Sequence, residues 1–266
     1  MILLRLLWGS LVYRPYVYAF LACYVVFAVR HLGAGRALSF LVSTYLVAYA
    51  CEYSATRNGF PFGHYRYFDD TRTRELWLAN VPLFDSLSFV FLSYFSFVLA
   101  AALLGDVSRP MSRVIPWLGG VLMVLLDVVI DPVALQGDKW FLGRLYDYPY
   151  RGFYFGVTAA NFAGWFFVGV LSQGLFQALL RAAGWSRGSR RATTPMSAGF
   201  VALAYGVYAA VLLFNLIITF AIGDYRLGVA SAAVSATTLG AIAVGLRWRR
   251  VALGSARAPE RAAELG

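Results

Sequence analysis

Leu122-Met123-Val124-Leu125-Leu126-Asp127-Val128-Val129-Ile130-Asp131-Pro132 is an apolar run that carries two acids four residues apart. Together with its apolar neighbours, this run is long enough for a helix that crosses a membrane. An acid at membrane depth costs about 3 kcal/mol on insertion scales, so it usually faces the interior of a helical bundle and serves a function. At a spacing of four residues both carboxyls lie on one helical face. The stretch therefore predicts a membrane helix with an acidic inner face.

The composition extends this prediction to the whole chain. The 266 residues are 60% hydrophobic and 14% charged, with a mean hydropathy of +0.66, which is typical of a membrane protein. Seven segments are candidate spans: roughly 12–29, 37–53, 84–104, 114–131, 153–180, 195–222 and 227–246. We expect an all-α polytopic helical bundle of about seven transmembrane helices. Six or eight spans are the alternatives, because Arg14 and Pro15 interrupt the first segment.

Residues 1–250 are expected to form a single integral-membrane domain, followed by a flexible carboxyl-terminal tail at 251–266. The net charge of +10 would suggest nucleic acid for a soluble protein, but these basic residues lie in loops between apolar spans. The lipid bilayer is therefore the predicted partner, and nucleic acid is not. Of the 23 Lys and Arg residues, 13 fall on the face that holds the carboxyl terminus. This asymmetry predicts a multi-pass protein of the cell membrane with a cytoplasmic carboxyl terminus.

Polar residues gather at one end of the predicted bundle. Spans two, four and six reach the same face carrying Glu52, Asp131 and Asp224, and spans three and five leave it with Asp85 and Asn161 near their starts. Asp127 lies one turn deeper than Asp131. This face is therefore the predicted location of a site.

The acids at this face have the features of general acids. Burial, like charge between Asp127 and Asp131, and the negative carboxyl ends of the helices that carry Glu52 and Asp131 all favour a protonated carboxyl. A protonated carboxyl at neutral pH is what general acid catalysis needs. We predict Asp127, Glu52, Asp131 and Asp85 as catalytic residues. The alternatives are that Asp131 marks a helix stop before Pro132 and that Asp85 caps the amino end of its span.

An aromatic loop adjoins these acids: Gly59-Phe60-Pro61-Phe62-Gly63-His64-Tyr65-Arg66-Tyr67. It is predicted to form a lid and aromatic wall over the site, since ring faces stabilise cations. The predicted substrate-binding residues are Phe60, Phe62, His64, Tyr65, Tyr67, Asn161 and Trp165. As alternatives, the rings belong to an interfacial aromatic belt, His64 is a surface residue, and Asn161 is an interhelical polar contact.

Several chemistries are excluded by missing residues. The lone lysine, Lys139, lies in a loop, so no Schiff base can form inside a span. Two histidines cannot supply a membrane di-iron site. Asp127 and Asp131 match the DxxxD spacing of membrane prenyltransferases, but a second Asp-rich motif on another span is missing. No metal site is therefore predicted, and protonatable carboxyls in an apolar aromatic cavity are what remains.

These motifs resemble a known family. Glu52-Tyr53, the Gly59 to Tyr67 loop, Val81-Pro82, the stretch from Asp127 to Pro132, and Asn161-Phe162-Ala163-Gly164-Trp165 are similar in order and kind to the CruF-type carotenoid biosynthesis membrane proteins. Members of that family include carotenoid 1,2-hydratases and bisanhydrobacterioruberin hydratases. The resemblance runs from about residue 45 to 170, and the Gly-x-Pro-Phe-Gly-x-Tyr element is its most specific part.

The resemblance implies an enzyme that hydrates the terminal double bond of a lycopene-like or γ-carotene-like substrate. Protonation would give a tertiary cation that water captures as a tertiary alcohol, with no cofactor and no metal. Other carotenoid biosynthesis enzymes are implied as partners. The alternatives are cyclisation or prenyl transfer at a carotenoid end, and, from another class, a proton-coupled transporter or lipid sensor.

Overall fold

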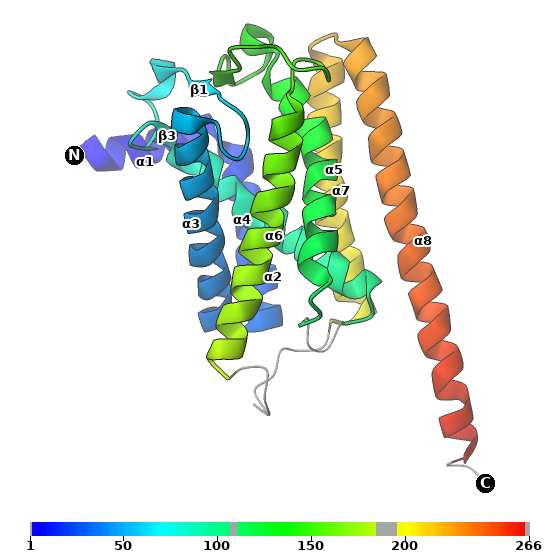
Figure 1. Ribbon diagram of the computed structural model, residues 1–266. Coiled ribbons are helices and arrows are strands. Elements are labelled where there is room, and N and C mark those ends of the chain that lie inside the picture. Colours follow the sequence, from blue (N-terminus) through cyan, green and yellow to red (C-terminus); the bar gives the residue numbers. More distant parts are fainter. Residues whose placement is uncertain (1, 107–110, 185–195, 264–266) are drawn as a thin grey trace.

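The computed structural model describes residues 2–106, 111–184 and 196–263 of the chain (Figure 1). Seven helices in this part are long and apolar enough to cross a membrane, which confirms the predicted all-α bundle. An eighth helix is shorter. The helices are α1 (Ile2–Tyr13), α2 (Pro15–Leu32), α3 (Ala34–Asn58), α4 (Leu83–Leu103), α5 (Ile115–Ala134), α6 (Ala159–Ala182), α7 (Ala198–Ala221) and α8 (Tyr225–Ala263).

The first span differs from the prediction of 12–29. The apolar run at the amino end forms the separate helix α1, which lies across the axes of the other helices (Figure 1). Helix α2 begins at Pro15, because proline fits the first turn of a helix, where its missing N–H costs no hydrogen bond. The break falls at Arg14, whose side chain is buried. The interruption noted in the sequence is therefore a boundary between two helices.

Two other predicted boundaries also change. The fifth span was predicted from residue 153, but α6 begins at Ala159, and residues 152–157 form a tight turn with bridges between Gly152 and Gly156 and between Tyr154 and Val157. Thr158 caps α6, with its Oγ1 accepting from the Asn161 N–H at 3.2 Å. At the other end of the chain, α8 continues to residue 263 through most of the predicted tail, and residues 264–266 lie outside the described part.

Helix α4 is the centre of the bundle. Its side chains from Phe89 to Ala102 are all buried, whereas α7 and α8 each keep an exposed apolar face. A helix that is apolar all round belongs in the middle of such a bundle. Helices α2, α3, α5, α7 and α8 pack around α4, and α6 packs mainly on α3 and α5.

The loops at one end of the bundle are tied together by short strands. Strand β1 (Arg66–Tyr67) of the α3–α4 loop pairs antiparallel with β4 (Tyr146–Asp147) of the α5–α6 loop, and β2 (Trp77–Leu78) pairs with β3 (Val81–Pro82). The short 3₁₀ helices η1 (Asp69–Thr71) and η2 (Gly137–Lys139) complete these loops. Both loops thus lie over the end where α3 and α5 finish and where α4 and α6 begin (Figure 1).

One glycine lets the aromatic loop press onto α6. A Cβ added at Gly164 would lie 2.4 Å from Cδ1 of Phe62 and 2.9 Å from its Cα. Both distances are shorter than Cβ atoms tolerate, and one of them is to the backbone. Only glycine therefore allows the Phe62 segment to rest on this helix.

We expect Gly164→Val to lower the free energy of unfolding by about 1–3 kcal/mol, because overpacking must displace the Phe62 backbone. Thermal unfolding of the purified protein in detergent measures this. Gly174→Ala on the same helix is the matched control, since its Cβ would meet nothing within 4 Å. The control should melt at or above the wild-type temperature. Equal melting of the two variants would contradict the packing described for Phe62.

Candidate active site

A cavity of about 130 Å³ lies beneath the two loops, at the end of the bundle where the polar residues gather. Side chains from α2 to α7 and from both loops line it. Most are aromatic or aliphatic, and the polar exceptions from the helices are Glu52, Asp85, Ser88, Asp131, Asn161 and Asn215. One water needs roughly 10–15 Å³, so this space holds a small apolar group together with water. The predicted site face is therefore hollow.

Asp127 and Asp131 share one amide. Nδ2 of Asn161 donates to Oδ2 of Asp127 at 2.8 Å and to Oδ2 of Asp131 at 2.6 Å. All three side chains are buried, and Asp131 and Asn161 line the cavity, whereas Asp127 lies behind them. Helix α5 continues past Pro132 to Ala134, so Asp131 does not mark a helix stop. The Asn161 amide group thus holds both carboxyls in place and orients Asp131 at the cavity wall.

This pair has no compensating cation in the described part of the chain. No lysine or arginine there forms an ion pair with either carboxyl. Among the described groups, Oδ1 of Asp127 also has no hydrogen-bond partner. Two carboxylates this close in apolar surroundings repel each other strongly. The arrangement therefore favours a pair that holds a proton.

Glu52, on α3, forms a second polar position in the cavity lining. Its Oε1 accepts from the Tyr67 hydroxyl at 2.8 Å, and its Oε2 accepts from the hydroxyl of Ser86 on α4. The carboxyl is 4% exposed and lines the cavity. The sequence predicted that Glu52 and the aromatic loop adjoin, and the Tyr67 contact confirms that they do.

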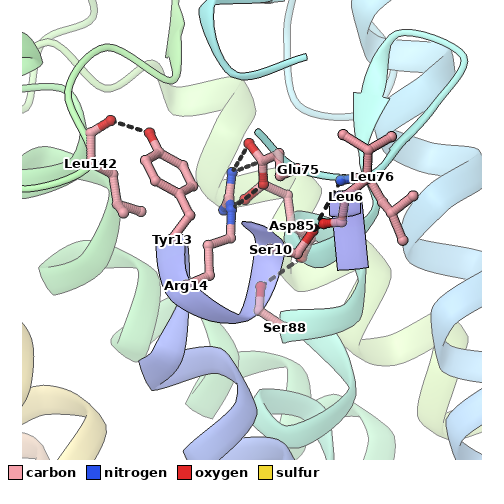
Figure 2. A network of polar contacts seen from close by, with 9 residues as sticks. All are labelled: Leu6, Ser10, Tyr13, Arg14, Glu75, Leu76, Asp85, Ser88 and Leu142. Carbon is pink, nitrogen blue, oxygen red and sulfur yellow. Dashed lines mark hydrogen bonds and ion pairs between the residues drawn. The ribbon is translucent and has the colours of Figure 1, made fainter. Parts of the chain in front are cut away.

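Asp85 also lines the cavity, from the first turn of α4. Figure 2 shows its carboxylate beside the guanidinium of Arg14, which also pairs with Glu75 at 2.6 Å. Sequence reasoning did not select Arg14 or Glu75. The signal for Arg14 is a charged residue inside the first apolar segment, which by itself predicts only an interruption of a span.

Four tyrosines form the wall nearest the loops. The Tyr65 ring lies 5.3 Å from Tyr67, 5.7 Å from Tyr146 and 6.1 Å from Tyr148, measured between ring centroids. Burial, and then the charge of Asp131, raise the pKa of Tyr146 well above its ordinary value. Burial and the charge of Glu52 likewise raise the pKa of Tyr65. Both phenols therefore keep their protons at neutral pH, and each has a hydroxyl to donate.

Another part of the cavity lining is apolar. The rings of Phe89 and Trp165 lie 4.5 Å apart, and Phe62 lies 6.0 Å from Phe89. Together with the tyrosines, Phe62, Phe89 and Trp165 line the same cavity as Asp131. An apolar group placed there would meet ring faces and edges on most sides.

Two of the predicted binding residues do not line the cavity. Phe60 is 58% exposed and packs on Phe167, with ring centroids 5.2 Å apart, and His64 is exposed. The other predicted binding residues, Phe62, Tyr65, Tyr67, Asn161 and Trp165, all line it. Tyr146, Tyr148 and Trp140 line it as well. These three aromatic residues of the α5–α6 loop are not among the binding residues predicted from the sequence.

The cavity contains the components of acid–base chemistry on an apolar substrate. It has protonatable carboxyls, phenolic donors and enclosing rings. Within the described ranges no three His, Cys, Asp or Glu side chains are grouped so that they could hold a metal ion. The fold and the cavity together define a multi-pass membrane protein whose buried carboxyls face an apolar, ring-lined space.

A family model described as carotenoid biosynthesis protein matches residues 13–241, so the chain belongs to this family. A relative, the bisanhydrobacterioruberin hydratase of Haloarcula japonica, is 31% identical over 137 residues, which are 51% of this chain and 43% of that protein. The match thus spans less than half of the relative's length. No solved structure matches the chain. The resemblance noted in the sequence is confirmed at the level of the family.

We expect Asn161→Leu to destabilise the protein by about 1–3 kcal/mol, because both carboxyls lose their shared donor. Asp127→Leu combined with Asn161→Leu should recover much of this loss, since the deep carboxyl and its donor are then removed together. Thermal unfolding of the single and double variants measures the coupling. A double variant that melts below the single variant would show that Asn161 does not act through Asp127.

Proposed function

We propose that the protein adds water across the terminal C1,C2 double bond of an acyclic carotenoid end group and forms a tertiary alcohol. Membership of a carotenoid biosynthesis family supports the substrate class. The name of the Haloarcula relative, a hydratase, supports the reaction. The observation that carries the proposal is the carboxyl pair Asp127 and Asp131, which share one amide donor at the wall of an aromatic cavity.

Asp131 is the proposed proton donor. An isolated double bond is a weak base, so its protonation needs an acid held at contact and shielded from water. Asp131 lines the cavity, and Asp127 behind it makes full ionisation of the pair unfavourable. The proton goes to the less substituted carbon, C2, and the positive charge develops on the tertiary carbon, C1.

The rings around the cavity stabilise this cation. Phe89, Trp165 and Tyr148 present π systems at the cavity wall, and cations are attracted to ring faces by about 0.5–2 kcal/mol each, more strongly where water is excluded. The apolar wall also leaves few nucleophiles in reach. A water molecule near the polar groups then forms the C–O bond, and a second carboxylate takes its proton.

The size of the cavity fits one end group. A space of about 130 Å³ holds a terminal isoprene unit with water, but not a whole carotenoid. The polyene chain therefore has to extend away from the cavity between apolar helices. Cyclisation is the rival reaction after the same protonation. The carboxyl and amide groups in the cavity lining favour water capture, since a cyclase must keep water out.

Expression in a bacterium that accumulates lycopene tests the proposal. We expect a product heavier by one water for each end that reacts. A product of unchanged mass with a ring would mean cyclisation. No new product from either lycopene or γ-carotene, despite normal protein levels in the membrane, would contradict the proposed function.

The same assay tests Asp131. We expect Asp131→Asn to lower the hydration rate by about 10²–10⁴-fold, the usual contribution of a positioned general acid. Asp138→Asn is the matched control, because that carboxylate lies at the same end of the bundle but is 77% exposed and pairs with Arg144. Full activity of Asp131→Asn at normal membrane levels would remove Asp131 as the acid.

A further inference from the structure

One cluster of charged residues at the cavity is buried and is not used by the proton donor. Arg14 lies at the junction of α1 and α2, Glu75 lies in the α3–α4 loop, and Asp85 lies in the first turn of α4 (Figure 2). The Arg14 side chain is 1% exposed and that of Glu75 is 0% exposed. We call these three residues the Arg14 cluster.

The guanidinium of Arg14 contacts both carboxylates. Its Nε donates to Oε2 of Glu75 at 2.6 Å, and Nη2 donates to Oε1 of Glu75 at 3.2 Å. Nη1 donates to Oδ1 of Asp85, and Nη2 also reaches Oδ2 of Asp85 at 3.4 Å. Planar paired contacts of this kind are the strong form of arginine–carboxylate recognition. Figure 2 shows the guanidinium beside both acids.

The cluster carries one positive and two negative formal charges. Burial alone would lower the pKa of Arg14, but the negative groups around it, Asp85 foremost, outweigh burial and raise this pKa well above its ordinary value. Arg14 is therefore a permanent cation. Glu75 is fully buried and does not line the cavity. Its single negative charge balances the positive charge of Arg14. Asp85 is left as the surplus negative charge.

That surplus charge faces the cavity. The Asp85 side chain is 18% exposed and lines the cavity, whereas its partners in the cluster do not. The amino end of α4 adds a favourable dipole for an anion at this position. Arginine and the helix dipole thus both favour an ionised Asp85 against the cost of its burial, whereas the pair of Asp127 and Asp131 has no such cation among the described residues.

A purely structural role would not need the third charge. Helix α1 is already fastened to the loops by two other hydrogen bonds: the Leu76 N–H donates to Oγ of Ser10 at 3.0 Å, and the Tyr13 hydroxyl donates to the carbonyl of Leu142 (Figure 2). A buried ion pair often contributes little net stability, and an extra buried carboxylate costs more. The position of this surplus charge at the cavity wall therefore indicates that Asp85 has a role in the reaction.

We propose that Arg14 and Glu75 are positioning residues that fix Asp85 as an ionised carboxylate at the cavity wall, where it faces the tertiary cation and accepts the proton of the attacking water. This proposal rests on the proposed function. The cation carries one positive charge and the cluster one net negative charge, so the two attract each other in the low dielectric of the bundle.

The atoms and charges of the step balance. Asp131 gives its proton to C2, which leaves a carboxylate and a cation at C1. The water oxygen forms the C–O bond to C1, and one water proton moves to Asp85. The product is the neutral alcohol, and transfer of the proton from Asp85 back to the Asp131 pair through water restores the resting state.

Other titratable groups lie near Asp85. They are Tyr13 from α1, Tyr16 from α2, Glu52 from α3, Tyr65, Tyr67 and Glu75 from the α3–α4 loop, and Asp131 from α5. Ser86, the residue after Asp85, donates a hydrogen bond to Glu52. A change at Asp85 is therefore most readily transmitted to the protonation state of Glu52. A test of Asp85 therefore has to remove the response of Glu52.

Infrared absorption of the purified protein at pH 7 tests the charge of Asp85 without any substrate. We expect Asp85→Asn, made in a Glu52→Gln background, to remove a carboxylate band and to leave the band of protonated carboxylic acids unchanged. Arg14 then keeps Glu75 as a one-to-one partner, so the variant should fold. Loss of a protonated carboxylic acid band instead would overturn the proposal.

Activity provides a second readout. In Arg14→Met combined with Glu75→Leu, Asp85 has no cation, so ionisation needs a higher pH. We expect the hydration rate at pH 7 to fall at least ~10-fold, mainly in kcat, and to recover partly as the pH rises. The reason is that a neighbouring arginine lowers the pKa of a carboxyl by about 1–3, and this variant lacks the arginine. Arg144→Gln is the control. It breaks the ion pair between Arg144, 59% exposed, and Asp138, 77% exposed, and should leave the pH profile unchanged.

The two proposals fail in different ways. If the wild-type protein hydrates no carotenoid, the proposed function fails, and the infrared result still decides whether Asp85 is ionised. If the wild-type protein is active and the Arg14→Met, Glu75→Leu variant has the same kcat and pH profile, the assigned role of the Arg14 cluster is wrong.

Discussion

A carboxyl group buried in a membrane protein must either keep its proton or find a positive partner, and this constraint organises the end of the bundle that holds the cavity. We propose that Asp127 and Asp131 meet it in the first way, since they share the Asn161 amide and form no ion pair within the described residues. Asp85 meets it in the second way, through Arg14. The loops, the strand pairing and the cross-lying helix α1 bring the groups of both kinds to one cavity.

The two solutions place acid and base on different helices. The uncompensated pair lies on α5 with its amide on α6, and the Arg14 cluster joins the α1–α2 junction to the start of α4. Environment alone separates chemically identical side chains into a proposed proton donor and a proposed proton acceptor, as in other enzymes that use two carboxyls. Between them, tyrosines and apolar rings leave room for an end group and water. Glu52, held by Tyr67 and Ser86, links the aromatic loop to this arrangement.

Sequence alone predicted the features that depend on local pattern. Apolar length gave the seven spans, and the parity of the spans placed Glu52, Asp85, Asp131 and Asn161 at one end, where the cavity contains them all. Contacts between distant segments could not be predicted in this way. Arg14 and Glu75 are 61 residues apart and meet only because α1 turns across the bundle at Pro15. The outward position of Phe60 and His64 is a second example, because Phe60 packs on Phe167 of α6, about 100 residues away in the sequence, which no local pattern encodes.

The central claim is that a carboxyl protonates the terminal double bond and that water captures the cation. The most direct measurement is the mass of the product formed by the purified protein from lycopene in deuterium oxide containing ¹⁸O. We expect one ¹⁸O atom and one carbon-bound deuterium for each hydrated end, with the deuterium retained after washing in ordinary water. An alcohol without carbon-bound deuterium, or with oxygen from a source other than water, would contradict it.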